Sequence, residues 1–185
     1  MKAAVLYGAN DLRYEDVETP KCTEDGILVK MIACGICGSD LRTYGGGSSS
    51  AIYPSISGHE IAGEIVESHM EDFPKGKKIS VAPVIACGEC WYCKNGMQNQ
   101  CDNLKMIGTA NGVPGGFAEY VSFTGDMVKH GCFNLIPEDF DPVSTVIAET
   151  ASSVLNAQIN IDLVMEDLVV VIGSGTIGCL HSEIA

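Results

Sequence analysis

The stretch "CGECWYCKNGMQNQCDNL" at residues 87–104 holds four of the nine cysteines of this 185-residue chain, in the pattern C-x2-C-x2-C-x7-C. Cysteines two or three residues apart in a turn can converge on one ion, and Zn²⁺ takes four ligands in a tetrahedron. Four thiolates leave no position for water or substrate. The pattern therefore predicts a structural zinc site formed by Cys87, Cys90, Cys93 and Cys101, with Gly88 and Gly96 easing the turns. The alternative is a set of reduced surface thiols. We expect this stretch to brace the fold and the chemistry to lie elsewhere.

Charge and composition exclude several classes of partner. The formal net charge is −13, and the longest basic cluster is "KGKK" at 75–78. Such a surface repels polyanions, so nucleic acid is not an expected partner. No stretch approaches the ~18 apolar residues of a membrane span, and the N-terminus lacks the apolar region of a signal peptide. We expect a cytoplasmic protein without membrane or nucleic-acid partners, in which clustered cysteines bind metal rather than form disulfides.

The sequence predicts β structure for most of the chain. Short segments rich in Val, Ile, Leu and Tyr and bounded by Gly, Pro or Asp predict strands at 2–7, 12–18, 26–33, 61–67, 78–84 and 116–123. Several short strands joined by irregular loops favour a barrel or a sandwich. The fold class expected for this part is mainly β.

A second domain is expected from residue 146 onwards. Residues 142–159 space apolar side chains at helical intervals, with Asp141 as the N-cap, and "LVVVI" at 168–172 is typical of a strand buried in a parallel sheet. The following G-x-G-x-x-G, formed by Gly173, Gly175 and Gly178, lets backbone amides at a helix N-terminus meet a pyrophosphate. The acidic residue that would hold the ribose is expected about 20 residues further on. We therefore expect a domain over 1–145 and a truncated dinucleotide-binding domain over 146–185, too incomplete to hold NAD(H) tightly or to turn over.

A second metal site is indicated upstream of the cysteine stretch. Cys37 lies in the glycine-flanked turn of "ACGICGSDL", and "SGHEIAGEI" supplies His59 and Glu60. A thiolate, an imidazole and a carboxylate from separate segments are ligand types of a catalytic zinc. Taken separately, the cysteine also fits a small core residue and the His-Glu pair a surface turn. No partner pattern is visible for His69, His130 or His181.

Six motifs in order give a more specific indication. They are "GICGSDL", "GHEIAGEIV", the cysteine stretch, "GGFAEYV" at 115–121, "AET" at 148–150 and "VVVIGSGTIG" at 169–178. In this order they resemble the zinc-dependent medium-chain dehydrogenases, particularly the polyol and threonine dehydrogenase branch, over residues 1 to 185. The resemblance implies a GroES-like β-barrel catalytic domain with a four-cysteine zinc lobe, followed by the first helix and β-strand of an incomplete Rossmann domain.

The resemblance also implies a role for each site residue. Cys37 and His59 would be catalytic zinc ligands, Glu60 a direct or exchangeable ligand, and Glu149 the third protein ligand. Ser39 would take the substrate's proton, and Asp40 would orient the zinc-bound histidine. The chain departs from the family pattern at Thr150, where the polyol branch usually has proline. It departs again at Arg42, where many relatives carry a histidine that extends the proton relay.

The implied function is hydride transfer between an alcohol or polyol and a nicotinamide, NAD or NADP, with one catalytic and one structural zinc. A full-length protein of this kind is expected to form homo-oligomers. One alternative is a non-catalytic zinc module for protein contacts or redox sensing, in which Cys37, His59 and Glu149 are incidental. A second alternative is a zinc-independent reductase with the same fold. The presence of Cys37, His59 and Glu149 together argues against it.

Overall fold

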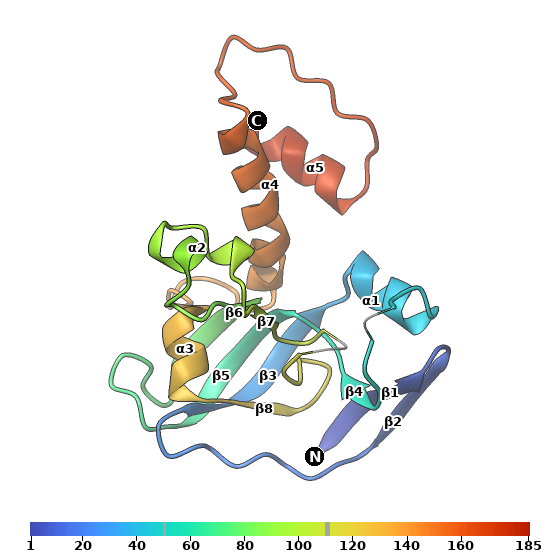
Figure 1. The fold of residues 1–185 in the computed structure, drawn as a ribbon, viewed down its shortest axis with the longest axis vertical. Helices are drawn as coiled ribbons and strands as arrows, with labels where there is room; N and C mark the ends of the chain where they lie inside the picture. The colour runs from blue at the N-terminus through green and yellow to red at the C-terminus, as the bar shows by residue number, and fades with distance from the viewer. Residues whose placement is uncertain (50, 110–111) are drawn as a thin grey trace. The chain divides into compact units, whose positions relative to one another are not determined.

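The computed structural model describes residues 1–49, 51–109 and 112–185. These residues form two compact units, Met1–Val146 and Ile147–Ala185, whose ribbon is drawn in Figure 1. Among the described residues, no helix combines the length and the apolar character that a membrane span requires.

The first unit is built from two antiparallel sheets. The smaller sheet has the order β2-β1-β4, with β1 at Lys2–Gly8, β2 at Asp11–Asp16 and β4 at Ser55–Ile56. The larger has the order β7-β6-β5-β3-β8, and β9 pairs with β6. Its strands are β3 (Ile27–Gly35), β5 (Glu60–Ser68), β6 (Lys78–Ile85), β7 (Lys105–Met106), β8 (Tyr120–Phe123) and β9 (Gly131–Leu135). The mainly β fold class expected from the sequence is confirmed.

All six expected strands form, although their ends differ. The largest difference is at 116–119, which the sequence assigns to a strand. This segment instead contacts β1, where Ala3 bridges Ala118 and the Ala4 amide donates to the Phe117 carbonyl at 2.8 Å. The sequence analysis missed β4, β7 and β9. The first two have only two residues each, too few to show an alternating pattern.

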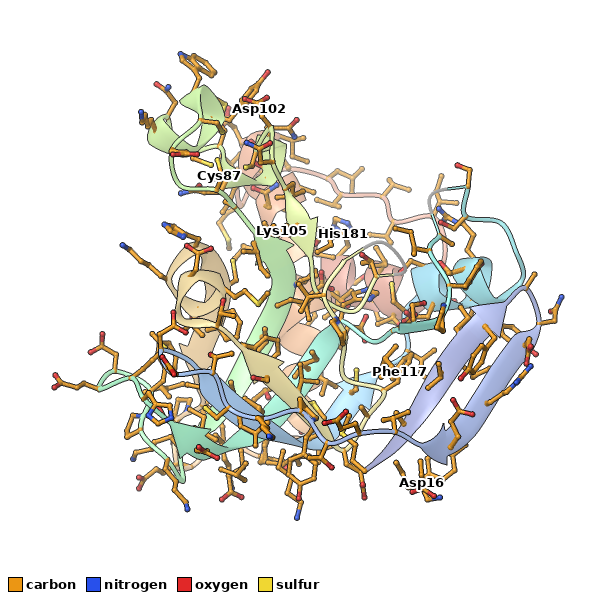
Figure 2. The ribbon with its side chains drawn as sticks, turned by 60° about the horizontal axis from the view of Figure 1, so that its bottom comes forward. Asp16, Cys87, Asp102, Lys105, Phe117 and His181 are labelled. Atoms are coloured by element: carbon orange, nitrogen blue, oxygen red, sulfur yellow. The ribbon has the colours of Figure 1, made fainter. Side chains whose placement is uncertain are left out.

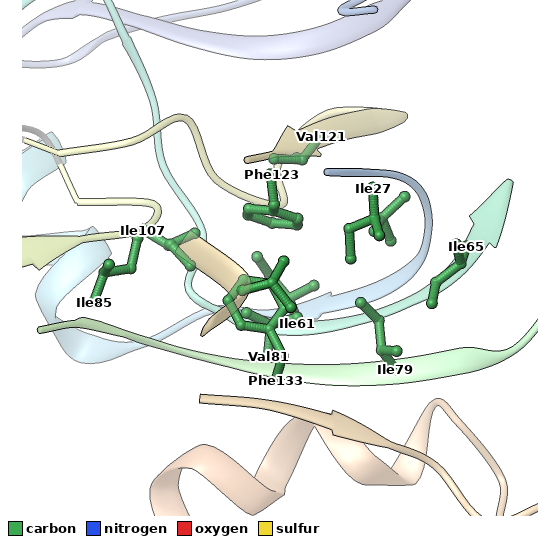
Figure 3. Packing of buried hydrophobic residues seen from close by; sticks show 12 residues of the cluster. Ile27, Ile61, Ile65, Ile79, Val81, Ile85, Ile107, Val121, Phe123 and Phe133 are labelled. Carbon is green, nitrogen blue, oxygen red and sulfur yellow. The ribbon is translucent and has the colours of Figure 1, made fainter. Parts of the chain in front are cut away.

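The larger sheet curls around one apolar core. Figure 3 shows this packing, to which side chains of β3, β5, β6, β8 and β9 contribute. Phe123 of β8 and Phe133 of β9 meet edge to face with ring centroids 5.0 Å apart. These two strands are not neighbours in the sheet, so their contact closes the curl. The core is Ile27, Val29, Ile61, Ile65, Ile79, Val81, Ile85, Ile107, Val121, Phe123, Val128 and Phe133.

Short helices connect the strands of the first unit. They are α1 (Gly38–Tyr44), α2 (Trp91–Lys94), the 3₁₀ turn η1 (Gln98–Gln100) and α3 (Gly125–His130). The Thr124 hydroxyl caps α3 by accepting from the Met127 amide at 3.2 Å. Figure 1 shows α1 beyond the end of β3 and α2 beyond the end of β6, so two separate loops lie at this side of the sheet.

The helix expected over 142–159 is a 3₁₀ turn, η2 (Ser144–Ile147), that continues as α4 (Ala148–Asn160). Asp141 caps it as expected, because its carboxylate accepts from the amides of Val143 and Ser144, both at 3.2 Å. In the second unit, α4 packs against α5 (Thr176–Ile184), and the Gln158 amide donates to the His181 carbonyl at 3.0 Å.

The strand expected at 168–172 does not form. No residue of this segment is paired among the described residues, and Leu168 and Ile172 are 93% and 97% exposed. The prediction was wrong for this structure because a parallel strand exists only when neighbouring strands satisfy its backbone groups, however apolar its sequence is.

Candidate metal centres

The four expected cysteines of the 87–104 stretch converge on one point. The Sγ atoms of Cys87, Cys90, Cys93 and Cys101 all lie within 4.8 Å of one another, with 3.4 Å between those of Cys90 and Cys93 and 3.9 Å between those of Cys87 and Cys93. Sulfurs bound ~2.3 Å from a tetrahedral ion lie ~3.8 Å apart. The cluster therefore has the size that a four-thiolate zinc site needs. Figure 2 labels Cys87 and Asp102 in this cysteine lobe, which projects from the sheet.

Backbone amides and one glycine shape the lobe around these sulfurs. The Cys101 sulfur accepts from the amides of Cys87 at 3.2 Å and of Asn103 at 3.4 Å. Gly88 has a φ of +74°, and a Cβ there would lie 2.7 Å from the His130 ring. Only glycine combines this backbone conformation with so close a neighbour. The expectation that Gly88 eases a turn is confirmed at this position.

Two neighbouring cysteines of the cluster have thiol pKa values shifted in opposite directions. Amides of Cys93 and Asp102 donate to the Cys90 sulfur and lower its pKa to about 6. Desolvation, followed by the neighbouring Cys90 sulfur, raises the pKa of the Cys93 thiol to about 12. The Cys90 thiolate is thus favoured by backbone amides, while the Cys93 thiol is favoured in its neutral form.

The second expected group comes from the facing ends of two paired strands. Gly35, the last residue of β3, is paired with Glu60, the first residue of β5. Cys37 follows β3 as the N-cap of α1, and His59 immediately precedes β5. Ligand atoms of Cys37, His59 and Glu60 lie within 4.8 Å of one another, and His59 is 7% exposed. The structure thus brings Cys37 together with two residues that lie more than twenty positions further along the sequence.

Asp40 connects two members of this group. Its Oδ2 accepts from the Cys37 amide at 2.9 Å, and its Oδ1 lies 3.7 Å from His59 Nδ1. The Nδ1 atom of His59 is buried and makes no hydrogen bond within the described chain. A buried imidazole that lies near a thiol and a carboxyl group, with a second carboxylate close to its Nδ1, offers the ligand types that zinc binds in proteins.

A cavity of about 310 Å³ opens beside His59 and Asp40. Ser39 and Arg42 of α1 line it, together with Ser48 and Thr109 from two loops. The cavity is polar and contains both a hydroxyl and a cationic side chain next to the proposed metal ligands. A small hydroxylated molecule could bind there.

The other expected site residues lie in the second unit. Glu149 is in the first turn of α4, and its role as a zinc ligand stays a prediction. Gly173 has a φ of +107°, Gly175 is the N-cap of α5, and Gly178 lies in the first turn of that helix. The glycine segment therefore forms a turn that leads directly into a helix N-terminus. Its binding of a cofactor stays a prediction.

One residue near the cysteine lobe was not found from the sequence. His130 Nδ1 lies 3.1 Å from Asp126 Oδ1, and the His130 ring covers Gly88. Both side chains lie on α3, so their spacing of four residues was a signal for the pair. The contact with Gly88 links residues 42 positions apart and has no signature in the sequence.

Comparisons with known proteins identify the family of the chain. Residues 23–132 match the alcohol dehydrogenase GroES-like domain family. The chain is 32% identical over 185 residues to the sorbitol dehydrogenase of Bacillus subtilis, covering 97% of this chain and 51% of that protein. It spans about half the length of the curated relatives that it matches.

Solved structures give the same result. The galactitol-1-phosphate dehydrogenase of Escherichia coli superposes with a TM-score of 0.87 at 29% identity, over 98% of this chain and 51% of that one. A short chain alcohol dehydrogenase of Escherichia coli CFT073, complexed with NADH, superposes with a TM-score of 0.86 at 31% identity, over 100% of this chain and 52% of that one.

Proposed function

Because the chain belongs to the alcohol dehydrogenase GroES-like domain family, we propose that it is the zinc-binding catalytic part of a dehydrogenase that transfers hydride between an alcohol or polyol and NAD or NADP. The observation that carries the proposal is the group of Cys37, His59 and Glu60, whose ligand atoms lie within 4.8 Å and whose histidine faces Asp40. Relatives named as sorbitol and galactitol-1-phosphate dehydrogenases support a polyol-type substrate. They do not favour the alternative of a non-catalytic zinc module.

Two zinc ions have separate proposed roles. Cys37 and His59 are proposed to hold the catalytic ion, with Glu60 as an exchangeable ligand, and the four cysteines of the lobe to hold the structural ion. Glu149 is the proposed third protein ligand of the catalytic ion, on the resemblance of its motif alone. The catalytic ion, when bound, supplies a Lewis acid that makes an alcohol proton more acidic. The cysteine cluster offers no open position once four thiolates are bound, so it has no direct part in the chemistry.

The protein's own side chains manage the proton. Asp40 holds the Cys37 turn through the amide hydrogen bond. Its other oxygen lies 3.7 Å from His59 Nδ1 and is proposed to orient the His59 ring when the metal is bound. The Ser39 hydroxyl, which lines the cavity beside His59, is proposed to take the proton from the substrate hydroxyl. Arg42 lines the same cavity but has only donors, so it cannot accept that proton onward. The proton would leave Ser39 through water or the neighbouring serine hydroxyls.

A nicotinamide is required because no amino-acid side chain accepts a hydride. The turn at Gly173 and Gly175, which leads into α5, is the proposed contact for its pyrophosphate. This turn is not fixed at the edge of a sheet, because residues 168–172 pair with no strand in the described part of the chain. We therefore propose that this chain alone binds NAD(H) weakly and does not turn over.

The first test is the number of zinc ions per chain, measured by elemental analysis of the purified protein and of two variants. Cys37→Ser should lose one ion and Cys93→Ser another. A Cys37→Ser variant that retains every zinc ion of the unmodified chain would contradict the catalytic assignment. The same sample, incubated with NAD and a panel of polyols, should show no rise in the absorbance of reduced nicotinamide, and a rise that depends on Cys37 would contradict the proposal that this chain alone does not turn over.

Cellular location and assembly remain predictions. A reducing compartment such as the cytoplasm is proposed because the clustered cysteines of the lobe are assigned to metal binding rather than to disulfides. Homo-oligomer formation by a full-length protein is likewise a prediction.

A further inference from the structure

A third group of metal-binding side chains lies at the opposite end of the β3–β5 pair from Cys37 and His59. Cys22 lies in the connection between β2 and β3, Glu67 near the end of β5, and His69 just beyond it. Their ligand atoms all lie within 4.8 Å of one another. The eight residue steps of β5 at ~3.3 Å each separate this group from Glu60 by ~25 Å. It is therefore independent of the proposed catalytic site.

Backbone hydrogen bonds hold the two segments together. The β3–β5 register pairs Ile27 with Ser68, so the connection before β3 lies beside the end of β5, as Figure 1 shows. The His69 amide donates to the Gly26 carbonyl at 2.9 Å. The Cys22 sulfur lies 3.6 Å from that carbonyl and 3.8 Å from the Glu67 carbonyl. The positions of the three side chains are thus set by the strand pairing.

The chemistry of the group suits a borderline divalent cation. It offers one thiol, one imidazole and one carboxylate, and His69 Nε2 lies 3.7 Å from Glu67 Oε1. Ligands around a tetrahedral zinc lie ~3.3–3.8 Å apart, so small side-chain rotations would complete the site. The side chains of His69 and Glu67 are 47% and 56% exposed, which leaves the fourth position open to water.

The surroundings are electronegative. Burial, followed by the nearby carboxylates of Glu67 and Asp25, raises the pKa of the Cys22 thiol. The two carboxylates place negative charge beside the Cys22 sulfur, which favours a cation there.

We propose that Cys22, Glu67 and His69 form a third site for a divalent transition-metal ion of the zinc class, with water as the fourth ligand. Binding there ties the β2–β3 connection to the end of β5. With three protein ligands and an exposed rim, the site exchanges its ion with the surrounding solution more readily than the four-cysteine lobe does.

The test is equilibrium dialysis against buffered free Zn²⁺, followed by elemental analysis. The unmodified chain should bind one more zinc ion than Cys22→Ser. Glu67→Gln and His69→Ala should need at least about tenfold more free Zn²⁺ to fill the site, since even the hydrogen-bond partners of metal ligands contribute that much. Cys132→Ser and Glu166→Gln, which change an exposed cysteine and an exposed carboxylate far from the group in the sequence, should bind as the unmodified chain does.

Two controls separate this site from the others. In a Cys37→Ser background, Cys22→Ser should still remove one further ion, so failure of the catalytic assignment would leave this result unchanged. Dialysis against Co²⁺ should give a thiolate-to-metal absorption band that Cys22→Ser reduces. Equal zinc content in the unmodified chain, Cys22→Ser and Glu67→Gln at every free Zn²⁺ concentration would overturn the proposal. Glu67→Gln keeps the test valid if Cys22→Ser fails to fold, because Glu67 is exposed.

Discussion

At the scale of single residues, Asp40 connects two of the proposed zinc ligands through its two carboxylate oxygens. Replacing it by Asn keeps its size but removes the charge that faces His59. We expect Asp40→Asn to weaken zinc binding at the Cys37–His59 site by about 10- to 100-fold, the usual effect of removing a carboxylate behind a metal-bound histidine. Competition with a chromophoric chelator measures the zinc affinity of the Cys37–His59 site. Asp16→Asn, which breaks only an exposed pair with Lys2, is the control. Equal chelator curves for the two variants would contradict the role given to Asp40.

Gly108 is a residue at which both conformation and space demand glycine. Its φ is +65°, and an added Cβ would collide with the Gly58 carbonyl and lie 3.1 Å from the His59 amide. We expect Gly108→Ala to lower the free energy of unfolding by about 3 kcal/mol or more, from left-handed strain plus overpacking. Gly76→Ala is the matched control, because Gly76 has a φ of +87° and no atom within 4 Å of the added Cβ. Its cost should be only the strain, ~1–2 kcal/mol. Denaturant unfolding compares the two, and equal midpoints would show that the close approach at Gly108 is readily relieved.

At the scale of elements, the curl of the larger sheet depends on a contact between β8 and β9. Phe123 is fully buried and meets Phe133 edge to face, as the close view in Figure 3 shows. Phe123→Ala should lower the free energy of unfolding by about 3–5 kcal/mol, because it removes a large core side chain and leaves a cavity. Phe140→Ala removes the same side chain at a site that is 58% exposed and should cost under about 0.5 kcal/mol. Chemical denaturation measures the free energy of unfolding of both variants. Comparable decreases in Phe123→Ala and Phe140→Ala would contradict a core centred on the Phe123–Phe133 pair.

The elements also show how far sequence could predict the structure. Short segments rich in Val, Ile and Leu and bounded by turn residues predicted the long strands β3, β5 and β6, because such side chains favour the half-buried surface of a sheet. The same reasoning failed at 168–172, where an apolar run has no strand to pair with. The two-residue strands β4 and β7 arise from tertiary contacts and leave no local pattern.

The candidate site was predictable to a similar extent. Spacing alone identified Cys87, Cys90, Cys93 and Cys101, because ligands close in sequence can converge within a turn. Cys37 and His59 meet only through the β3–β5 register, so their association depended on a resemblance among motifs. Glu67 and His69 lie two residues apart, but their third partner, Cys22, is 45 positions from Glu67. The sequence alone therefore gave no reason to place Cys22 near Glu67 and His69.

At the scale of the whole molecule, the cysteine lobe and the β core are expected to have separate stabilities. Of residues 87–104, none belongs to the described apolar core cluster, so the lobe has little apolar burial of its own. Its order then depends on the metal, as in small domains whose folding free energy is metal-binding free energy. Trp91 is the single tryptophan of the chain, is 64% exposed and lies in this lobe, which makes its fluorescence a local reporter.

Removal of zinc with a strong chelator should therefore change the Trp91 emission while the far-ultraviolet circular dichroism of the sheets is retained. Cys93→Ser should show the altered emission before any chelator is added, because three thiolates cannot complete the tetrahedron that orders the lobe. Cys132→Ser changes a cysteine on β9, outside the lobe, and should respond to the chelator as the unmodified chain does. If the dichroism falls in step with the emission, the lobe and the sheets unfold as one cooperative unit. The lobe zinc would then stabilise the whole first unit rather than the lobe alone.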